Sequence, residues 1–295
     1  MQNPTRDLLL SWLKKRLEPS ASSFLEDALR QIEKGVPIEQ FCALISQCSR
    51  YVRKQPLAPE RGEALRLLEG WNPERWSTVE TSRVALVLSR PDLDRKEGVE
   101  ALEEAFRYAD VGELCALYKS LAYLPDAGRV VARAAEGCRS SMRVVFESTA
   151  CDTPYPFLYF DELWWNQALI KCLFIEAPLW RLFGVDRRLN PELARMALDL
   201  ADERRSAGRA VQHELWMCLG GHGGERAIES LEREIKSGME MGRVAAAYGL
   251  GRAGARSRIE QLLRVETRPD VASALRLALS EPITQMCFAR LSGAG

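Results

Sequence analysis

The sequence predicts an all-α protein, arranged as an α-solenoid of stacked helical hairpins with no sheet. Apolar residues recur with the helical period along the 295-residue chain, and no segment shows the sustained alternation of apolar and polar residues that marks a half-buried strand. A helical pattern near the C-terminus also repeats after about 31 residues, a length typical of stacked helical hairpins. A compact orthogonal bundle is the alternative architecture.

Helix signals begin at the N-terminus. A first helix is predicted over residues 4–18. Ser23 and Glu26 have the spacing of a capping box, in which each side chain accepts a hydrogen bond from the backbone of the other residue. A second helix should therefore start there and end at Gly35. Pro37 then fits the first turn of a third helix.

Two further helix starts are marked by capping residues. Ser77 and Glu80 have the spacing of another capping box. Asn190 can cap a helix whose first residue is Pro191, because proline suits the first helical position. That helix should run to Gly208.

The internal repeat lies in the last third of the chain. Leu219-Gly220 and Ile228-Glu229 match Leu250-Gly251 and Ile259-Glu260 in order and spacing. In each copy a helix should end at a glycine-rich turn, and a second helix should follow with apolar residues on one face. The second copy, with its small alanines, closely resembles the short type of HEAT-like repeat. Residues 117–135 are a more degenerate candidate upstream.

These signals divide the chain into four consecutive parts, which we expect to form one continuous domain. The stretch QPLAPERG (55–62) has the proline and polar residues of a linker and separates the first two parts. The parts are an N-terminal helical segment (1–55), degenerate helical repeats (63–150), central helices (151–217) and short HEAT-like repeats (218–295).

Composition and charge argue against several classes of protein. Lysine and arginine together number 41, as do aspartate and glutamate, so the formal charge of zero does not favour nucleic acid or an anionic membrane. Arginines gathered over 243–276 raise the alternative of a helical-repeat DNA glycosylase, but no concentrated basic face supports it. No apolar run approaches the roughly 20 residues that span a bilayer. We expect no nucleic-acid partner and no membrane span.

Cysteine usage points to the cytoplasm. The eight cysteines are scattered, with no CxxC pair and no neighbouring histidines at metal-ligand spacing. Buried free thiols in a reducing compartment explain them. The N-terminal segment reads as an amphipathic helix, because its apolar run is too interrupted for a signal peptide. The expected location is cytoplasmic, with no metal and no cofactor.

Residues 151–172 combine prolines, aromatic rings and polar side chains in one short stretch. Pro154 and Pro156 disfavour a continuing helix, which predicts a rigid extended entry over 151–157. The helix that follows, over 158–174, is apolar nearly all round and should be central and buried.

A buried Glu162 or Asn166 would cost roughly 1–3 kcal/mol or more without partners, so two explanations compete. In the first, these side chains tie the extended segment to neighbouring helix ends, and the rings are core. In the second, polar side chains line a concave pocket for a small polar molecule, with Trp164 or Trp165 as a wall. The pocket residues would be Asp152, Tyr155, Glu162, Asn166 and Lys171.

Arg187 and Arg188 precede the predicted cap at Asn190. They could point toward an anion together with the first free amides of that helix. Salt bridges to Asp186 and Glu192 within the turn are the alternative. The sequence leaves both interpretations open.

Motifs for catalysis are missing. His213 and His222 are the two histidines of the chain, their spacing fits no known metal site, and no GxSxG nucleophile elbow is present. The string GLGRAG (249–254) matches the glycine spacing of a dinucleotide site, but no strand precedes it. We therefore predict no catalytic residue.

Several unusual strings resemble the EboA proteins encoded in bacterial ebo clusters. They are CDTPYP (151–156), the letters YFDE, WNQ and LF within 159–174, the segment from VDRR to AGR (185–209) and ELW (214–216). The resemblance implies a place in making or moving a bacterial secondary metabolite. It carries over no catalytic residue, because the family has no established reaction.

Two functions from different classes follow. The first is a non-catalytic binding or scaffold protein of an ebo-type pathway, whose concave helical-repeat surface holds other proteins of the pathway or a small polar metabolite. The alternative is a small-molecule enzyme or metabolite carrier with a pocket around Glu162, Asn166 and Asp152. The sequence identifies neither the ligand nor the protein partner.

Overall fold

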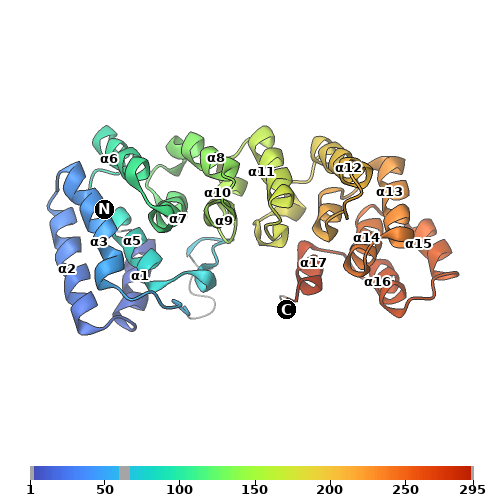
Figure 1. The fold of residues 1–295 in the computed structure, drawn as a ribbon, viewed down its shortest axis with the longest axis horizontal. Coiled ribbons are helices and arrows are strands. Elements are labelled where there is room, and N and C mark those ends of the chain that lie inside the picture. The colour runs from blue at the N-terminus through green and yellow to red at the C-terminus, as the bar shows by residue number, and fades with distance from the viewer. Residues whose placement is uncertain (1–2, 60–66, 294–295) are drawn as a thin grey trace. The chain divides into compact units, whose positions relative to one another are not determined.

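The computed structural model describes residues 3–59 and 67–293 (Figure 1). Over these residues the regular structure is helical, apart from an isolated bridge between Pro56 and Ser77. The all-α prediction is therefore confirmed. The chain forms two compact units, the amino-terminal unit Met1–Asp161 and the carboxy-terminal unit Glu162–Gly295. The four-part division and the solenoid arrangement stay predictions.

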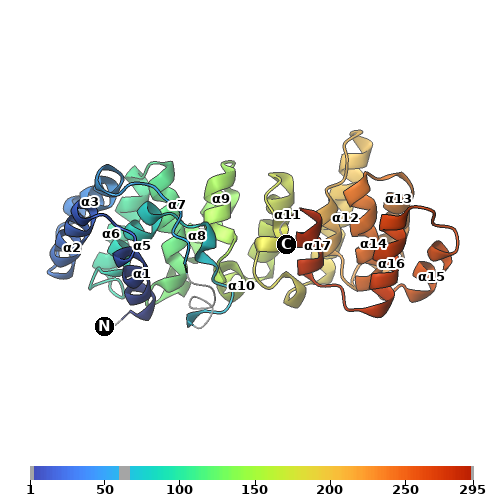
Figure 2. The ribbon, with the colours of Figure 1, turned by 90° about the horizontal axis from the view of Figure 1, so that it is seen from below.

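Helix α5 (Thr78–Leu88) is the centre of the amino-terminal unit, because residues on all of its faces are buried. It packs against α1 (Pro4–Lys14), α3 (Ile38–Tyr51) and α7 (Val111–Ser120), and Figure 2 shows it between α3 and α7. The remaining helices of this unit are α2 (Pro19–Glu33), α6 (Lys96–Tyr108), α8 (Val131–Arg139), α9 (Arg143–Ala150), α10 (Tyr155–Tyr159) and the short 3-10 helices η1 (Pro73–Arg75), η2 (Leu121–Tyr123) and η3 (Ala127–Val130).

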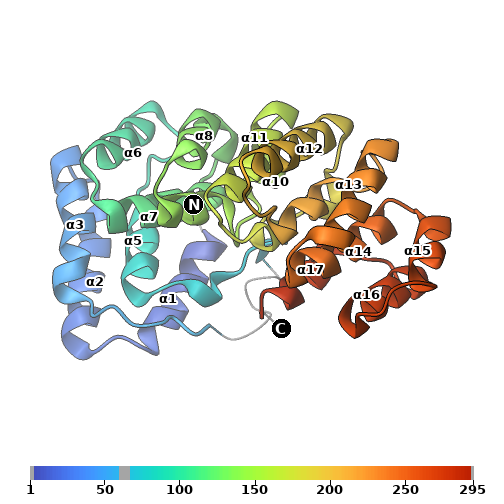
Figure 3. The same cartoon turned by 45° about the vertical axis from the view of Figure 1, so that its right-hand side comes forward.

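Helix α14 (Glu240–Arg252) has the corresponding place in the carboxy-terminal unit. It packs against α13 (Gly224–Ser237) and α16 (Pro269–Ser280), and it lies between them in Figure 3. The remaining helices of this unit are α11 (Glu162–Phe174), α12 (Pro191–Ser206), α15 (Arg256–Leu263), α17 (Gln285–Leu291) and the 3-10 helices η4 (Leu179–Arg181), η5 (Val185–Arg187) and η6 (His213–Cys218).

The two copies of the internal repeat differ in their first helix. The second copy is the hairpin of α14 and α15, which turns at Gly254 with φ 68°, a left-handed conformation that glycine adopts without steric cost. In the first copy the short 3-10 helix η6 precedes α13. Their HEAT-like character stays a prediction.

Two of the predicted helix caps are confirmed. The Glu80 carboxylate accepts a hydrogen bond from the Ser77 amide at 2.8 Å, and the Ser77 hydroxyl accepts one from the Glu80 amide at 3.3 Å. The Asn190 side chain accepts a hydrogen bond from the Leu193 amide at 2.8 Å, and Pro191 is the first residue of α12. Both caps depend on short-range spacing that the sequence shows directly.

The predicted capping box at Ser23 and Glu26 is wrong. Helix α2 starts at Pro19, one turn earlier, so both residues lie inside it. Proline at the first helical position has the right backbone angle and no amide that needs a partner, which lets the helix begin without a side-chain cap. The predicted end at Gly35, where φ is 84°, agrees with the structure.

The predicted extended entry over 151–157 is also wrong. Tyr155–Tyr159 form the short helix α10, in which Pro156 lies in the first turn and so removes no helical hydrogen bond. The chain is extended at Phe160, with ψ 138°, before α11 begins. Glu162 is therefore the first residue of α11 and is exposed, in contrast to the buried position expected for it.

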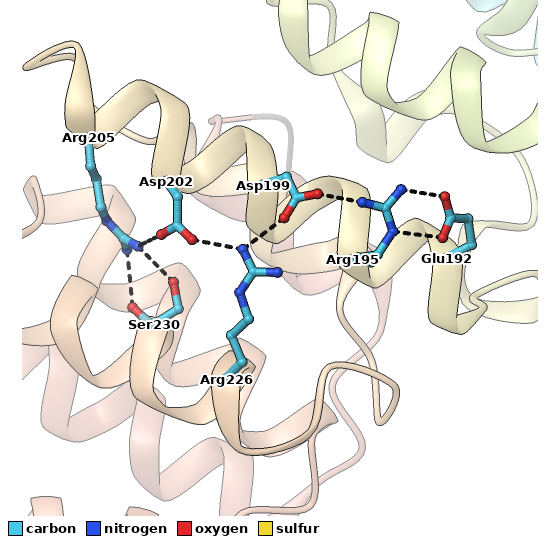
Figure 4. A network of polar contacts seen from close by, with 7 residues as sticks. All are labelled: Glu192, Arg195, Asp199, Asp202, Arg205, Arg226 and Ser230. Carbon is cyan, nitrogen blue, oxygen red and sulfur yellow. Dashed lines mark hydrogen bonds and ion pairs between the residues drawn. The ribbon is translucent and has the colours of Figure 1, made fainter.

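Charged side chains join α12 to α13 in the network that Figure 4 shows. The Arg226 guanidinium lies 2.8 Å from carboxylate oxygens of both Asp199 and Asp202. The Arg205 guanidinium donates to the Ser230 hydroxyl at 2.7 Å. The network thus fixes two α-helices that are separated in the chain by the 3-10 helix η6.

We expect Arg205→Met to destabilise the carboxy-terminal unit by about 3 kcal/mol, because it leaves the buried Glu234 carboxylate without the cation that now lies 3.0 Å away. Arg195→Met, on the same helix, removes a solvent-exposed ion pair and should leave the stability unchanged. Urea unfolding followed by circular dichroism measures both. Equal midpoints for the two variants would contradict the burial argument.

Candidate functional site

Four aromatic rings meet inside the amino-terminal unit, and we call Trp12, Trp71, Trp76 and Tyr123 the Trp71 cluster. The centroid of the Trp71 ring lies 5.7 Å from that of Trp12, 5.9 Å from that of Trp76 and 4.9 Å from that of Tyr123. Trp12 comes from α1, Tyr123 from η2, and the other two rings flank η1. The cluster therefore connects three separate parts of the chain.

Two polar atoms of this cluster have no hydrogen-bond partner within residues 3–59 and 67–293. The Trp71 indole nitrogen and the Tyr123 hydroxyl are buried and unpaired among the residues that the structure describes. A buried polar group without a partner costs about 1–3 kcal/mol. Burial raises the pKa of Tyr123 well above its usual value, and the negative charge of Asp152 adds to the effect. Tyr123 therefore stays a neutral hydroxyl at physiological pH.

Asp152, one of the predicted site residues, lies beside this cluster. Its carbonyl oxygen accepts a hydrogen bond from the Asn72 amide at 2.9 Å, and one carboxylate oxygen lies 3.9 Å from Nε of Arg75. Its side chain is only 9% exposed, and its backbone has φ 58°. A residue other than glycine in the left-handed region is held there by its surroundings, which is common at binding and catalytic sites.

A cavity of about 510 Å³ has Tyr123 in its lining. Its volume lies in the range of small-molecule sites, and its lining combines apolar and charged side chains. The apolar part includes Leu88, Leu93 and Leu124, and the charged part includes Arg6, Glu33, Arg90 and Asp94. Tyr123 belongs both to this lining and to the Trp71 cluster, so the cavity adjoins the cluster at this residue.

A second, more open cleft of about 710 Å³ lies beside Trp76. Glu80 lines it and pairs with Lys119, whose ammonium lies 5.6 Å from the centre of the Trp76 ring. Burial acts to raise the pKa of Glu80, but the charge of Lys119 and hydrogen bonds from Lys119 and Ser77 outweigh it and hold that pKa below its usual value. The Glu80 carboxylate is thus engaged within the protein.

The predicted residue Asn166 is buried in the carboxy-terminal unit and pairs with Asn190. Each amide donates to the oxygen of the other, at 3.1 and 2.8 Å, while Asn190 also caps α12. The indole of Trp165 donates to the Arg188 carbonyl at 3.1 Å, and the Arg188 guanidinium lies 4.8 Å from the centre of that ring. Asn166 thus ties α11 to the start of α12, as the first of the two sequence-based explanations expects.

The other predicted site residues are dispersed. Tyr155 belongs to the amino-terminal unit and donates its hydroxyl to the Ala127 carbonyl at 2.6 Å. In the carboxy-terminal unit Lys171 lies 5.6 Å from the centre of the Phe174 ring, and the Arg187 guanidinium lies 4.6 Å from that of Phe183. Glu162 is exposed and Trp164 is partly exposed. A ligand-binding role for these residues stays a prediction.

Asp186 does not form the local salt bridge that was the alternative to an anion site. One of its carboxylate oxygens lies 2.6 Å from the Arg252 guanidinium, and the other accepts a hydrogen bond from the Gln285 amide at 2.9 Å. Glu192 pairs with Arg195 instead. Asp186 thus joins η5 to the end of α14 and the start of α17.

His213 takes part in a contact that resembles a catalytic triad without having its geometry. Its Nε2 lies 3.1 Å from the Ser292 hydroxyl, which donates to Glu214 at 3.4 Å. In a triad the acid binds the opposite ring nitrogen, whereas here the Glu214 oxygen lies 3.9 Å from the same Nε2. The other Glu214 oxygen accepts from the Leu179 amide at 2.5 Å. This group therefore holds the C-terminal helix in place.

Within residues 3–59 and 67–293, no group of three or more histidine, cysteine, aspartate or glutamate side chains could hold a metal ion. Within the same ranges, no helix has the length and apolarity needed to cross a bilayer.

A family model described as metabolite traffic protein EboA matches residues 5–220. No curated protein and no solved structure matches the chain. The matched range contains the Trp71 cluster, Asp152 and the paired asparagines.

We expect Asn166→Leu to destabilise the protein by about 1–3 kcal/mol, because it removes the two buried hydrogen bonds between the Asn166 and Asn190 amides at a helix start. Gln167→Leu is the matched control, since Gln167 is the exposed neighbour on α11. Thermal unfolding measures the difference. If the Asn166→Leu protein is as stable as the control, the structural role of Asn166 is wrong and a ligand contact becomes the better explanation.

Proposed function

The chain belongs to the EboA family of metabolite traffic proteins, and from this premise we propose that it binds a small metabolite in the cavity of its amino-terminal unit without transforming it. The volume of about 510 Å³ supports this proposal, because it suits a small molecule and not a protein surface. The lining combines apolar walls with a few charged groups, which is the usual composition of such sites.

The arrangement of polar groups favours binding over catalysis. Near the cavity, Arg6 pairs with Glu33 and Arg90 pairs with Asp92. The alternative pocket around Glu162, Asn166 and Asp152 has weaker support, because Asn166 already uses both ends of its amide on Asn190. A general acid or base must reach its substrate with a free proton or lone pair.

We propose that the protein acts in the cytoplasm and that its partners are other proteins of the same bacterial pathway. The eight free cysteines support a reducing compartment, because six of them are buried thiols of the kind found there. The family description supports a role in passing a metabolite onward.

Native mass spectrometry of the protein purified from its own host tests this function. We expect the wild-type protein to carry a small molecule and Ala122→Trp to lose it, because the indole fills the cavity that Ala122 lines. Ala207→Trp is the control, since Ala207 is exposed at the end of α12 in the other unit.

The same preparation tests whether the protein transforms the molecule that it binds. After incubation, the molecule released from the wild-type protein should keep its mass. A wild-type protein that is empty, or an Ala122→Trp protein as fully occupied as the control, would disprove binding in this cavity. A released molecule of changed mass would show that the protein is an enzyme.

A further inference from the structure

We infer that the cavity of the amino-terminal unit selects a positively charged metabolite, an organic ammonium compound with an apolar body, whose charge pairs with Asp94. This inference rests on the proposed function, because it concerns the ligand of the same cavity. It starts from the charged side chains of the lining, which are Arg6, Glu33, Arg90 and Asp94. The partners that these groups already have decide which charge a ligand can bring, since a charge taken out of water needs a partner of opposite sign.

Arg90 is enclosed by groups of the protein. Its Nε lies 2.7 Å from one carboxylate oxygen of Asp92, and its Nη2 donates to the other oxygen at 3.0 Å. The side chain is only 8% exposed, and the guanidinium lies 5.0 Å from the centre of the Phe41 ring. The charge of Arg90 is therefore compensated before any ligand arrives.

Arg6 is shared between two carboxylates. It donates from Nε and Nη2 to one oxygen of Asp7, at 3.2 and 3.1 Å. It also donates from Nη1 to one oxygen of Glu33 at 2.9 Å. One positive charge therefore faces two negative charges, so this side of the cavity has no cation to spare for an anionic ligand.

Asp94 is a carboxylate of the lining that has no cation. Its side chain has no hydrogen bond and no ion pair in the part of the chain that the structure describes. Arg129 donates to the backbone carbonyl of Asp94 at 2.9 Å, but its Nε pairs with the Asp126 carboxylate at 3.7 Å. The carboxylate of Asp94 thus remains available to a ligand.

The charge around the cavity is negative as a result. The lining and its direct ion partners contain two guanidinium groups and four carboxylates, those of Asp7, Glu33, Asp92 and Asp94. A concave site with an excess of one charge attracts ligands of the opposite charge and repels ligands of the same charge. An ammonium group gains an ion pair there, whereas a carboxylate or phosphate group meets an excess of two negative charges.

Three probes that carry different groups on the same naphthylmethyl body test this inference. They are 1-naphthylmethylamine, which is a cation at neutral pH, the neutral 1-naphthalenemethanol and the anionic 1-naphthylacetate. Ligand-observed NMR titration should show that the wild-type protein binds the amine about tenfold more tightly than the alcohol, the effect of one charge-assisted hydrogen bond. The carboxylate should bind most weakly of the three.

Asp94→Asn should bring the affinity for the amine close to that for the alcohol and leave the affinity for the alcohol unchanged. Glu97→Gln is the matched control, because Glu97 is an exposed acid in the first turn of α6, outside the cavity lining. It should keep the preference for the amine. Added sodium chloride should weaken that preference in the wild-type protein, since salt screens exposed charges.

Equal binding of the amine and the alcohol by the wild-type protein, tightest binding of the carboxylate, binding of no probe, or a preference that survives in Asp94→Asn would overturn the inference. Ala122→Trp separates this failure from that of the proposed function. If the wild-type protein binds the amine and the alcohol equally and Ala122→Trp binds neither, the cavity is a binding site and the charge selection alone is wrong.

Discussion

The burial of Trp71 against Trp12, Trp76 and Tyr123 is the constraint on which the amino-terminal unit depends. These rings come from α1, from both sides of η1 and from η2, so one apolar contact fixes segments that are far apart in the sequence. Large aromatic side chains bury much apolar surface and contribute correspondingly to stability. That contribution allows two donors to remain unpaired in the same place, because it exceeds the cost of leaving each one without a partner.

Polar contacts have the corresponding role in the carboxy-terminal unit. Asn190 caps α12 and holds Asn166, while Asp186 binds both Arg252 and Gln285. The family model ends at residue 220, and the last two of these residues lie beyond it. The residues after 220 therefore complete the unit that begins at α11, because they supply partners for a carboxylate of the matched region.

Local signals in the sequence predicted the helical class and the caps at Ser77 and Asn190, because a cap depends on residues within one turn. The same kind of signal failed at Ser23, where Pro19 starts the helix one turn earlier, and at Pro156, which fits a first helical turn as well as it ends a helix. The Trp71 cluster was missed because its members lie on separate elements. In the sequence, the two tryptophans that flank η1 gave the one local sign of this cluster. Asp152 was predicted as a site residue, but the aromatic rings beside it were not.

Transfer of a metabolite requires selectivity together with release. A dense set of polar contacts would give high affinity, and affinity differences appear mainly as slower dissociation. A cavity with apolar walls and a few charged groups instead holds a small molecule through fewer polar contacts, which suits its later release. The free protein remains folded because the unpaired donors cost about 1–3 kcal/mol each, within a typical stability of about 5–15 kcal/mol.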